Sequence, residues 1–170
     1  EDYGRHESNS RIIETMSYLK TNKVNVQVDH IFGAPSENKE DLEKSLQLYR
    51  VIKPQIILTF WLTFYPKTKI IGLARKRGIL SEEDINRIEE GYVGYTHDFG
   101  SVIKEKIPLF TKYELMIELA SVCHNDKIWS LLLKIVPIVP FKKLISYFIY
   151  TFTGIRYNRD YIFNKFRYVF

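Results

Sequence analysis

The chain has 170 residues, of which 45% are hydrophobic and 26% are charged, a balance that excludes a disordered or fibrous protein. Its single cysteine, Cys123, excludes a disulfide framework within the chain and favours a reducing, cytoplasmic setting. One cysteine cannot hold an iron–sulfur cluster either, because such a cluster takes about four ligands, mostly thiolates. The chain starts at Glu1 without a methionine or an apolar signal segment, so we expect a piece of a longer protein.

The net charge of +5 is unevenly distributed along the chain. Residues 1–126 carry 17 Lys and Arg against 19 Asp and Glu, whereas residues 127–170 carry 8 Lys and Arg against Asp160 alone. This asymmetry predicts that the two segments have different roles.

The first half of the chain alternates between helical and strand patterns. Apolar residues at helical spacing predict a helix over 8–21, and a period of two predicts a strand over 24–32. In that strand the even positions are apolar apart from His30. The odd positions carry polar side chains until Ile31, namely Asn25, Gln27 and Asp29.

A turn over 33–37 separates this strand from a helix predicted over 39–52. Asn38, with Asp41 three residues later, is typical of a helix N-cap. A second strand is predicted over 55–65, and one of its rows is apolar. The opposite row carries Thr59, Trp61, Thr63 and Tyr65.

Two strands joined by one helix predict a parallel βαβ unit with a right-handed crossover. Parallel strands normally have both faces covered by apolar packing. A polar row on each strand therefore favours an α/β fold in which both rows face the lumen of a partial barrel that holds a ligand.

The rest of the chain is predicted to be mainly helical. Helices are expected over about 68–77, capped by Thr68, and from Ser81 to near Gly91. Residues 91–109 have an irregular pattern, and a Thr111–Glu114 capping box predicts a helix that ends near Cys123. We therefore expect three parts, namely a barrel portion over 1–80, a helical and irregular connection over 81–126, and a basic, aromatic helical extension over 127–170.

Three motifs, together with their order and spacing along the chain, carry a resemblance to a known family. The first is Asp29-x-Ile31-x-Gly33-x-Pro35-x-Glu37, at the carboxyl end of the first strand, where ligands bind in parallel α/β folds. The second strand ends in Tyr-Pro-Lys-Thr over 65–68, and residues 4–9 lead into the first helix. Over residues 4–80 the chain resembles the second half of the radical S-adenosylmethionine (SAM) partial barrel, especially in members that also carry a cobalamin-binding domain. Ser36 and Lys67 stand where that family usually has glycine.

The resemblance implies a fold, a set of cofactors and several site residues. The fold would be the C-terminal portion of a (β/α)6 partial TIM barrel followed by a mostly helical extension. SAM would bind at Asp29, Ile31 and Gly33, with Ile31 against the adenine and Gly33 admitting the adenosyl group. The substrate, a small molecule or a macromolecule, would face Asn25, Gln27, Thr59, Trp61, Thr63 and Tyr65.

In this family a [4Fe–4S] cluster cleaves SAM reductively. The three-cysteine loop that holds the cluster belongs to the first half of the barrel and is absent from this chain. The N-terminal half barrel, with an optional cobalamin domain, would thus be the partner within the same polypeptide. The implied reaction is methyl transfer or another radical transformation, and the chain alone would be inactive.

A purely structural role is the simpler interpretation of several of these residues. On periodicity alone Ile31 is a core residue, and Asp29 is a hydrogen-bonded strand residue of any α/β protein. His30 lies on the helix-facing side and is expected to be a core histidine. Trp61 and Tyr65 are as consistent with filling the barrel as with contacting a ligand.

The apolar stretch over 128–152 allows three interpretations. Lys134, Lys142, Lys143 and two prolines interrupt it, which argues against a membrane span. It can form helices that pack on the barrel, a peripheral contact with an anionic membrane, or a site for RNA or another polyanion. The alternative function is therefore an α/β binding module whose basic tail docks on a membrane or polyanion.

Overall fold

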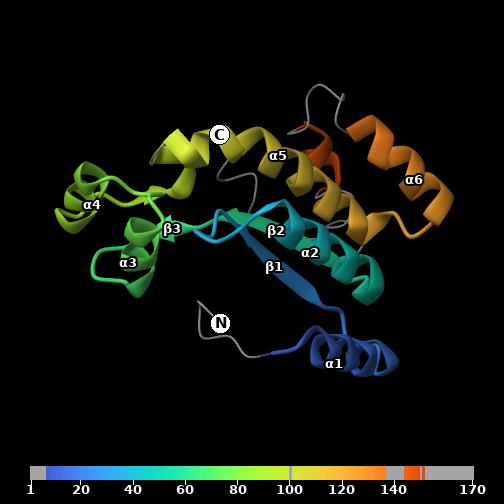
Figure 1. Cartoon of the computed structure of the whole chain (residues 1–170). Helices are drawn as coiled ribbons and strands as arrows, with labels where there is room; N and C mark the ends of the chain where they lie inside the picture. Colours follow the sequence, from blue (N-terminus) through green and yellow to red (C-terminus); the bar gives the residue numbers. More distant parts are fainter. Residues whose placement is uncertain (1–6, 100, 137–143, 150, 152–170) are drawn as a thin grey trace.

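The computed structural model describes residues 7–99, 101–136, 144–149 and 151, which form a mixed α/β structure that is mostly helical (Figure 1). Its strands form a parallel pair, β1–β2, and a short antiparallel pair, β3–β4. The elements in chain order are α1 (Asn9–Thr21), β1 (Gln27–Phe32), α2 (Lys39–Ile52), β2 (Ile56–Trp61), β3 (Thr63–Phe64), α3 (Lys69–Lys76), α4 (Glu82–Glu89), β4 (Gly94–Tyr95), the 3-10 turn η1 (Thr96–Asp98), α5 (Ser101–Val122) and α6 (Asp126–Ile135).

The β1–α2–β2 unit agrees with the sequence prediction. The two strands are parallel neighbours, and α2 begins after an N-cap at Asn38. The Asn38 side chain accepts hydrogen bonds from the backbone amides of Glu40 and Asp41, and the Asp41 carboxylate accepts one from the Asn38 amide in return. This reciprocal cap satisfies amides that the first helical turn leaves without partners.

Helices α2 and α5 cover one face of the parallel pair. Phe32 of β1 is fully buried, and its ring packs against Trp61 of β2 and Phe110 of α5. Helix α2 contributes Leu42, Leu46, Tyr49 and Ile52 to the same cluster of buried side chains, and α1 contributes Met16. The main core thus lies mainly between the sheet and helices α2 and α5, of which α5 is drawn above the strands in Figure 1.

A second, smaller cluster surrounds β3. Phe64 is fully buried there and packs edge-to-face against Phe99, together with side chains of α3 and α4. Helix α4 begins where the sequence predicts, and Ser81 and Asp84 form a capping box at its start. Thr68 occupies the N-cap position of α3 but does not cap it through its side chain, because its hydroxyl donates to the Tyr65 carbonyl instead.

Helix α5 differs from the sequence prediction. It starts at Ser101, so the prediction of an irregular segment up to 109 and of a helix start at Thr111 is wrong. Thr111 lies inside the helix, where its hydroxyl donates to the Ile107 carbonyl. Pro108 is accommodated within this helix, although proline removes one backbone donor and usually ends a helix. The buried residues that follow, Phe110 among them, hold the helix against the sheet.

The two clusters of buried side chains divide the chain differently from the predicted parts. Residues 62–99 supply the smaller cluster, and segments on either side of them supply the larger one, up to Val136 and Ile149. The boundaries at 80 and 126 stay predictions, and most of the predicted 127–170 extension lies outside the described residues. Within the described part of the chain, no helix is long and apolar enough to cross a membrane.

Candidate functional site

The face of β1–β2 opposite α2 and α5 is the candidate site, and we call it the open face. It carries Gln27, Asp29 and Ile31 from β1 and Ile56, Leu58 and Phe60 from β2, and Ile56 at its start is buried. Ile31 is 48% exposed and Phe60 is 46% exposed, although both are large apolar side chains in strands. The Gln27 amide donates to the Asp29 carboxylate at 3.0 Å and thereby orients it. The open face therefore combines exposed apolar surface with an oriented carboxylate.

The register of the two strands corrects the predicted lumen. In the parallel pair, Asp29 is the partner of Leu58, whereas Thr59 is the partner of His30 and Trp61 of Phe32. Neighbouring partners point to the same face of a sheet. The prediction that the polar rows of both strands share one cavity is therefore wrong. Thr59 and Trp61 belong to the covered face, and the open face carries the apolar row of β2.

The other predicted substrate-facing residues lie outside the parallel pair. Asn25 is an exposed residue that precedes β1, and Thr63 belongs to β3, where its partner is Tyr95 of β4. Tyr65 follows β3 and is exposed. The structure thus brings together Gln27, Asp29 and Ile31 on one face, and it does not gather the remaining predicted residues with them.

The loop over 33–37 follows β1 and is held by its own side chains. The Gly33 amide donates to the Glu37 carboxylate at 2.7 Å, and the Glu37 amide donates to the Ala34 carbonyl at 2.9 Å. Gly33 has φ +87°, a conformation that favours glycine. A Cβ at this position would lie 2.3 Å from Oγ1 of Thr96, which is itself fully buried. Glycine is therefore required here by the approach of Thr96, a reason the sequence pattern did not reveal.

Glu37 is the loop's titratable group. Burial raises the pKa of the Glu37 carboxyl to about 7, and the nearby Asp41 adds to the rise. The hydrogen bonds from Gly33 and Ala34 and the charge of Lys106 oppose it without cancelling it. The carboxyl that closes this loop thus keeps its proton to a higher pH than an exposed glutamate does.

His30 lies on the covered face, as the alternation of β1 predicts. Its Nδ1 lies 2.9 Å from the hydroxyl of Tyr49 on α2, while Nε2 is buried without a hydrogen-bond partner among the described residues. Burial lowers the pKa of His30 to about 4 and raises the pKa of Tyr49 to about 12. His30 is therefore a neutral core histidine near neutral pH.

A buried carboxylate on α5 was not found from the sequence. Glu118 is 1% exposed, and its carboxylate accepts a hydrogen bond from Thr59 of the covered face at 2.9 Å. The Thr59 hydroxyl also lies 3.2 Å from the Glu114 carboxylate, and Ser146 donates to the second Glu118 oxygen. The i, i+4 spacing of the two glutamates on an otherwise apolar helix face was the available signal. This contact explains why a threonine stands in the middle of β2.

The donor sets decide which cofactors the described residues can hold. Among the residues that the structure describes, no group of three or more His, Cys, Asp or Glu side chains could hold a metal ion. An iron–sulfur cluster does not fit this donor set, because its thiolates would have to come from elsewhere. The open face offers aliphatic and aromatic surface beside the Asp29 carboxylate.

A separate groove lies away from the open face. It has a volume of about 560 Å³ and is lined by side chains of α2, α5 and α6, including Arg50, Tyr113 and Trp129. Its polar groups serve the structure, since Arg50 pairs with Asp126 and stacks on Trp129, and Tyr113 donates to Glu43. The groove joins α6 to the core.

The chain was compared with models of protein families, with curated proteins and with solved structures, and none of the three comparisons found a match.

Proposed function

We propose that this chain is the C-terminal part of a radical SAM enzyme and supplies one wall of its cavity. The observation that supports the proposal is the open face of β1–β2, with Asp29 and Ile31 exposed on it. Parallel strands are normally covered on both faces. Among the described residues, the helix side chains pack on the side of Phe32 and Trp61, while Ile31 and Phe60 on the other side are about half exposed. The open face is where the lumen of a partial barrel would lie once further strands continued the sheet.

The chemistry of the open face suits an adenosyl group. An adenine ring gains from contact with an apolar side chain such as Ile31, and a carboxylate such as Asp29 accepts hydrogen bonds from hydroxyl or amino groups. These positions are the ones that the resemblance assigns to SAM binding. The loop over 33–37 follows directly, at the carboxyl end of β1, where ligands of parallel sheets bind.

The register changes which side chains would face the substrate. Because Thr59 and Trp61 pack against α5, the β2 contribution to the cavity is the apolar pair Leu58 and Phe60. We propose that the substrate group beside this wall is apolar, with Gln27 and Asp29 as its polar contacts.

The rest of the polypeptide would supply what this chain lacks. In the proposed enzyme a [4Fe–4S] cluster bound elsewhere supplies the reductive cleavage of SAM, and this chain binds and orients the adenosyl group and excludes water. Methyl transfer with cobalamin remains part of the proposal through the resemblance alone.

The test uses the full-length polypeptide. We expect anaerobic reduction in the presence of SAM to yield 5′-deoxyadenosine, and we expect Ile31→Glu to abolish it. Val51→Glu is the matched control, because Val51 is an exposed apolar residue of α2 that lines the groove beside α6 and lies outside the open face. A full-length sequence without a three-cysteine loop, or equal activity of both variants, would contradict the proposal.

A further inference from the structure

Helix α6 carries an exposed apolar ridge that the core does not use. Ile128, Leu131 and Ile135 recur at helical spacing, and the first two are 53% and 56% exposed. They lie on one side of the helix, because successive residues are offset by about 100°. No residue of α6 between Asp126 and Ile135 is buried. The ridge is therefore a continuous apolar surface and not a single exposed side chain.

The opposite side of α6 anchors the helix. Trp129 packs against the main core and lies under the Arg50 guanidinium, 4.6 Å from its carbon to the ring centroid. Val136, which caps the helix, is buried in the same core. Asn125 caps the first turn through the amides of Lys127 and Ile128. Because α6 is fixed in this way, it presents the ridge in a defined orientation.

The segment over 144–149 repeats the pattern. Leu144 and Phe148, four residues apart, are both more than half exposed, whereas Ile149 is buried in the main core. Both this segment and α6 thus contribute one side to the core and leave large apolar side chains outside it.

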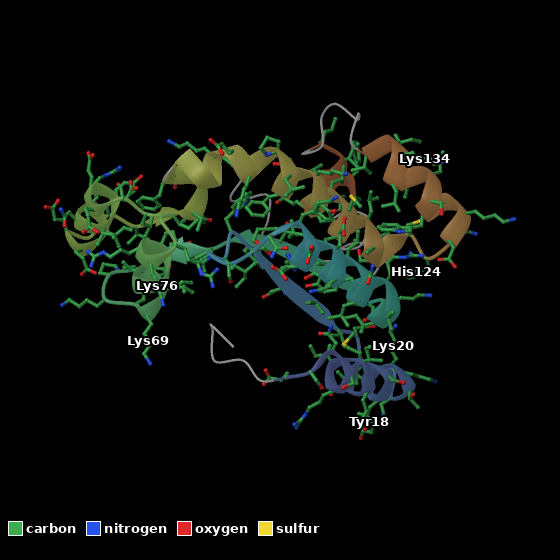
Figure 2. All side chains as sticks on the ribbon, in the orientation of Figure 1. Tyr18, Lys20, Lys69, Lys76, His124 and Lys134 are labelled. Atoms are coloured by element: carbon green, nitrogen blue, oxygen red, sulfur yellow. The ribbon has the colours of Figure 1, made fainter. Side chains whose placement is uncertain are left out.

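Positive charge borders the ridge. Lys127 and Lys134 are exposed and, seven residues apart, lie on one side of α6 next to Leu131 (Lys134 in Figure 2). In sequence, residues 127–170 carry 8 Lys and Arg against Asp160 alone. An apolar stripe with lysines along its edge is typical of helices that lie in a membrane interface, where the apolar side chains enter the acyl region and the lysines contact anionic headgroups. Exposed Ile and Leu side chains do not stack on bases, so the described surface favours lipid over RNA.

We propose that the α6 ridge docks the protein peripherally on an anionic lipid surface. The ridge enters the boundary between headgroups and acyl chains, and Lys127 and Lys134 remain at the level of the phosphates. This binding is independent of SAM and of the open face, which lies on a different element.

The experiment is flotation of the 170-residue chain with vesicles. Vesicles of phosphatidylcholine with phosphatidylserine are compared with vesicles of phosphatidylcholine alone, at low and at raised salt. We expect binding to the anionic vesicles that salt weakens. Lys127→Gln with Lys134→Gln should lower the partition coefficient about 25-fold, because each cation near an anionic surface contributes about a factor of five. Ile128→Ser with Leu131→Ser should lower it at least about tenfold, because those side chains no longer enter the bilayer.

Matched variants control for charge and exposure. Lys69→Gln with Lys76→Gln removes two lysines from α3, and Tyr18→Ser removes a 69% exposed ring from α1; Figure 2 shows all three residues away from α6. These variants should bind as the wild type does, and unchanged thermal melts would show that every variant folds.

Three outcomes would overturn the proposal. The first is absence of binding to anionic vesicles, and the second is an equal loss of binding in the α6 and control variants. The third is a wild type that forms a dimer but binds no vesicles, with the dimer lost in the Ile128→Ser, Leu131→Ser variant. The last result would assign the ridge to a second copy of the chain.

Discussion

The two faces of the β1–β2 pair are built by the same two strands and have opposite characters. The covered face holds Phe32 and Trp61 against α2 and α5, with Thr59 hydrogen-bonded to the buried Glu118. The open face holds Ile31 and Phe60 in the exposed state, beside the Asp29 carboxylate. The comparison shows that the covered face accounts for stability, whereas the open face leaves apolar surface for a ligand or for further strands.

The comparison also shows why the polarity of the β2 side chains predicted the wrong face for the lumen. Thr59 is polar, but it meets a polar group that α5 buries, so its polarity serves the core. Phe60 is apolar, yet it is exposed because nothing in the described chain covers it. A row of polar side chains on a strand therefore does not by itself indicate a cavity. The element that packs against the row must also be known, because it can supply buried polar partners.

The largest expected effect separates the two faces directly. Phe32→Ala should lower the free energy of unfolding by about 3–5 kcal/mol, because it opens a cavity in the core. Phe60→Ala, which removes a half-exposed ring of the same type, should cost less than about 1 kcal/mol. Chemical denaturation of both variants measures the difference, and equal losses would mean that the open face is also a core surface.

The next effect concerns two buried titratable groups, whose contributions to stability change in opposite directions as pH falls. The pKa of His30 is lowered from 6.5 to about 4, so the unfolded chain binds the proton more tightly, and His30 reduces stability as pH falls from 6.5 to 4. The pKa of Glu37 is raised from 4.5 to about 7, so the folded chain binds the proton more tightly, and Glu37 adds stability as pH falls from 7 to 4.5. The two contributions oppose each other in the wild type.

Single variants separate these contributions. Relative to the wild type, Glu37→Gln should lose up to about 3 kcal/mol of unfolding free energy as pH falls from 7 to 4.5. His30→Phe should gain stability relative to the wild type as pH falls from 6.5 to 4, by a similar amount. Denaturation curves across this pH range test both signs, and a difference from wild type that does not vary with pH would contradict the burial of that group.

A smaller effect tests the loop that borders the open face. Gly33→Ala should cost about 2 kcal/mol, because of its positive φ and the contact with Thr96. Thr96→Ala removes the hydroxyl that the new Cβ would meet, so the double variant should recover about 1 kcal/mol of that loss. A double-mutant cycle measures the coupling, and strictly additive losses would exclude the contact.

The smallest effect compares polar residues on the two faces. Thr59→Val should cost about 1–2 kcal/mol, since it removes a donor from the buried Glu118 carboxylate. Asp29→Asn, a polar change on the open face, should stay within about 0.5 kcal/mol of the wild type. A larger loss from Asp29→Asn than from Thr59→Val would reverse the assignment of the faces.

Local signals predicted much of this fold. Helix α2 and its Asn38 cap, α4 and its Ser81 cap, and the parallel pairing of β1 with β2 all follow from residues close together in sequence. The start of α5 did not follow, because Pro108 is tolerated only where tertiary packing holds the helix.

The candidate site was predictable only in part. Alternation along β1 placed Asp29 and Ile31 on the face opposite His30, and the structure agrees. The partner row on β2 was not predictable, because the loops around α2 set the register, and a shift of one residue exchanges the two faces. The contact of Gly33 with Thr96 joins residues far apart in sequence, so no local pattern contains it.

The most direct test of the central claim is an NMR titration of the ¹⁵N-labelled 170-residue chain with SAM. The account predicts shifts of the amides of Asp29, Ile31 and Gly33 that Ile31→Glu abolishes and Val51→Glu leaves intact. Shifts confined to the covered side around His30 and Thr59, or the same shifts in the Ile31→Glu variant, would contradict it.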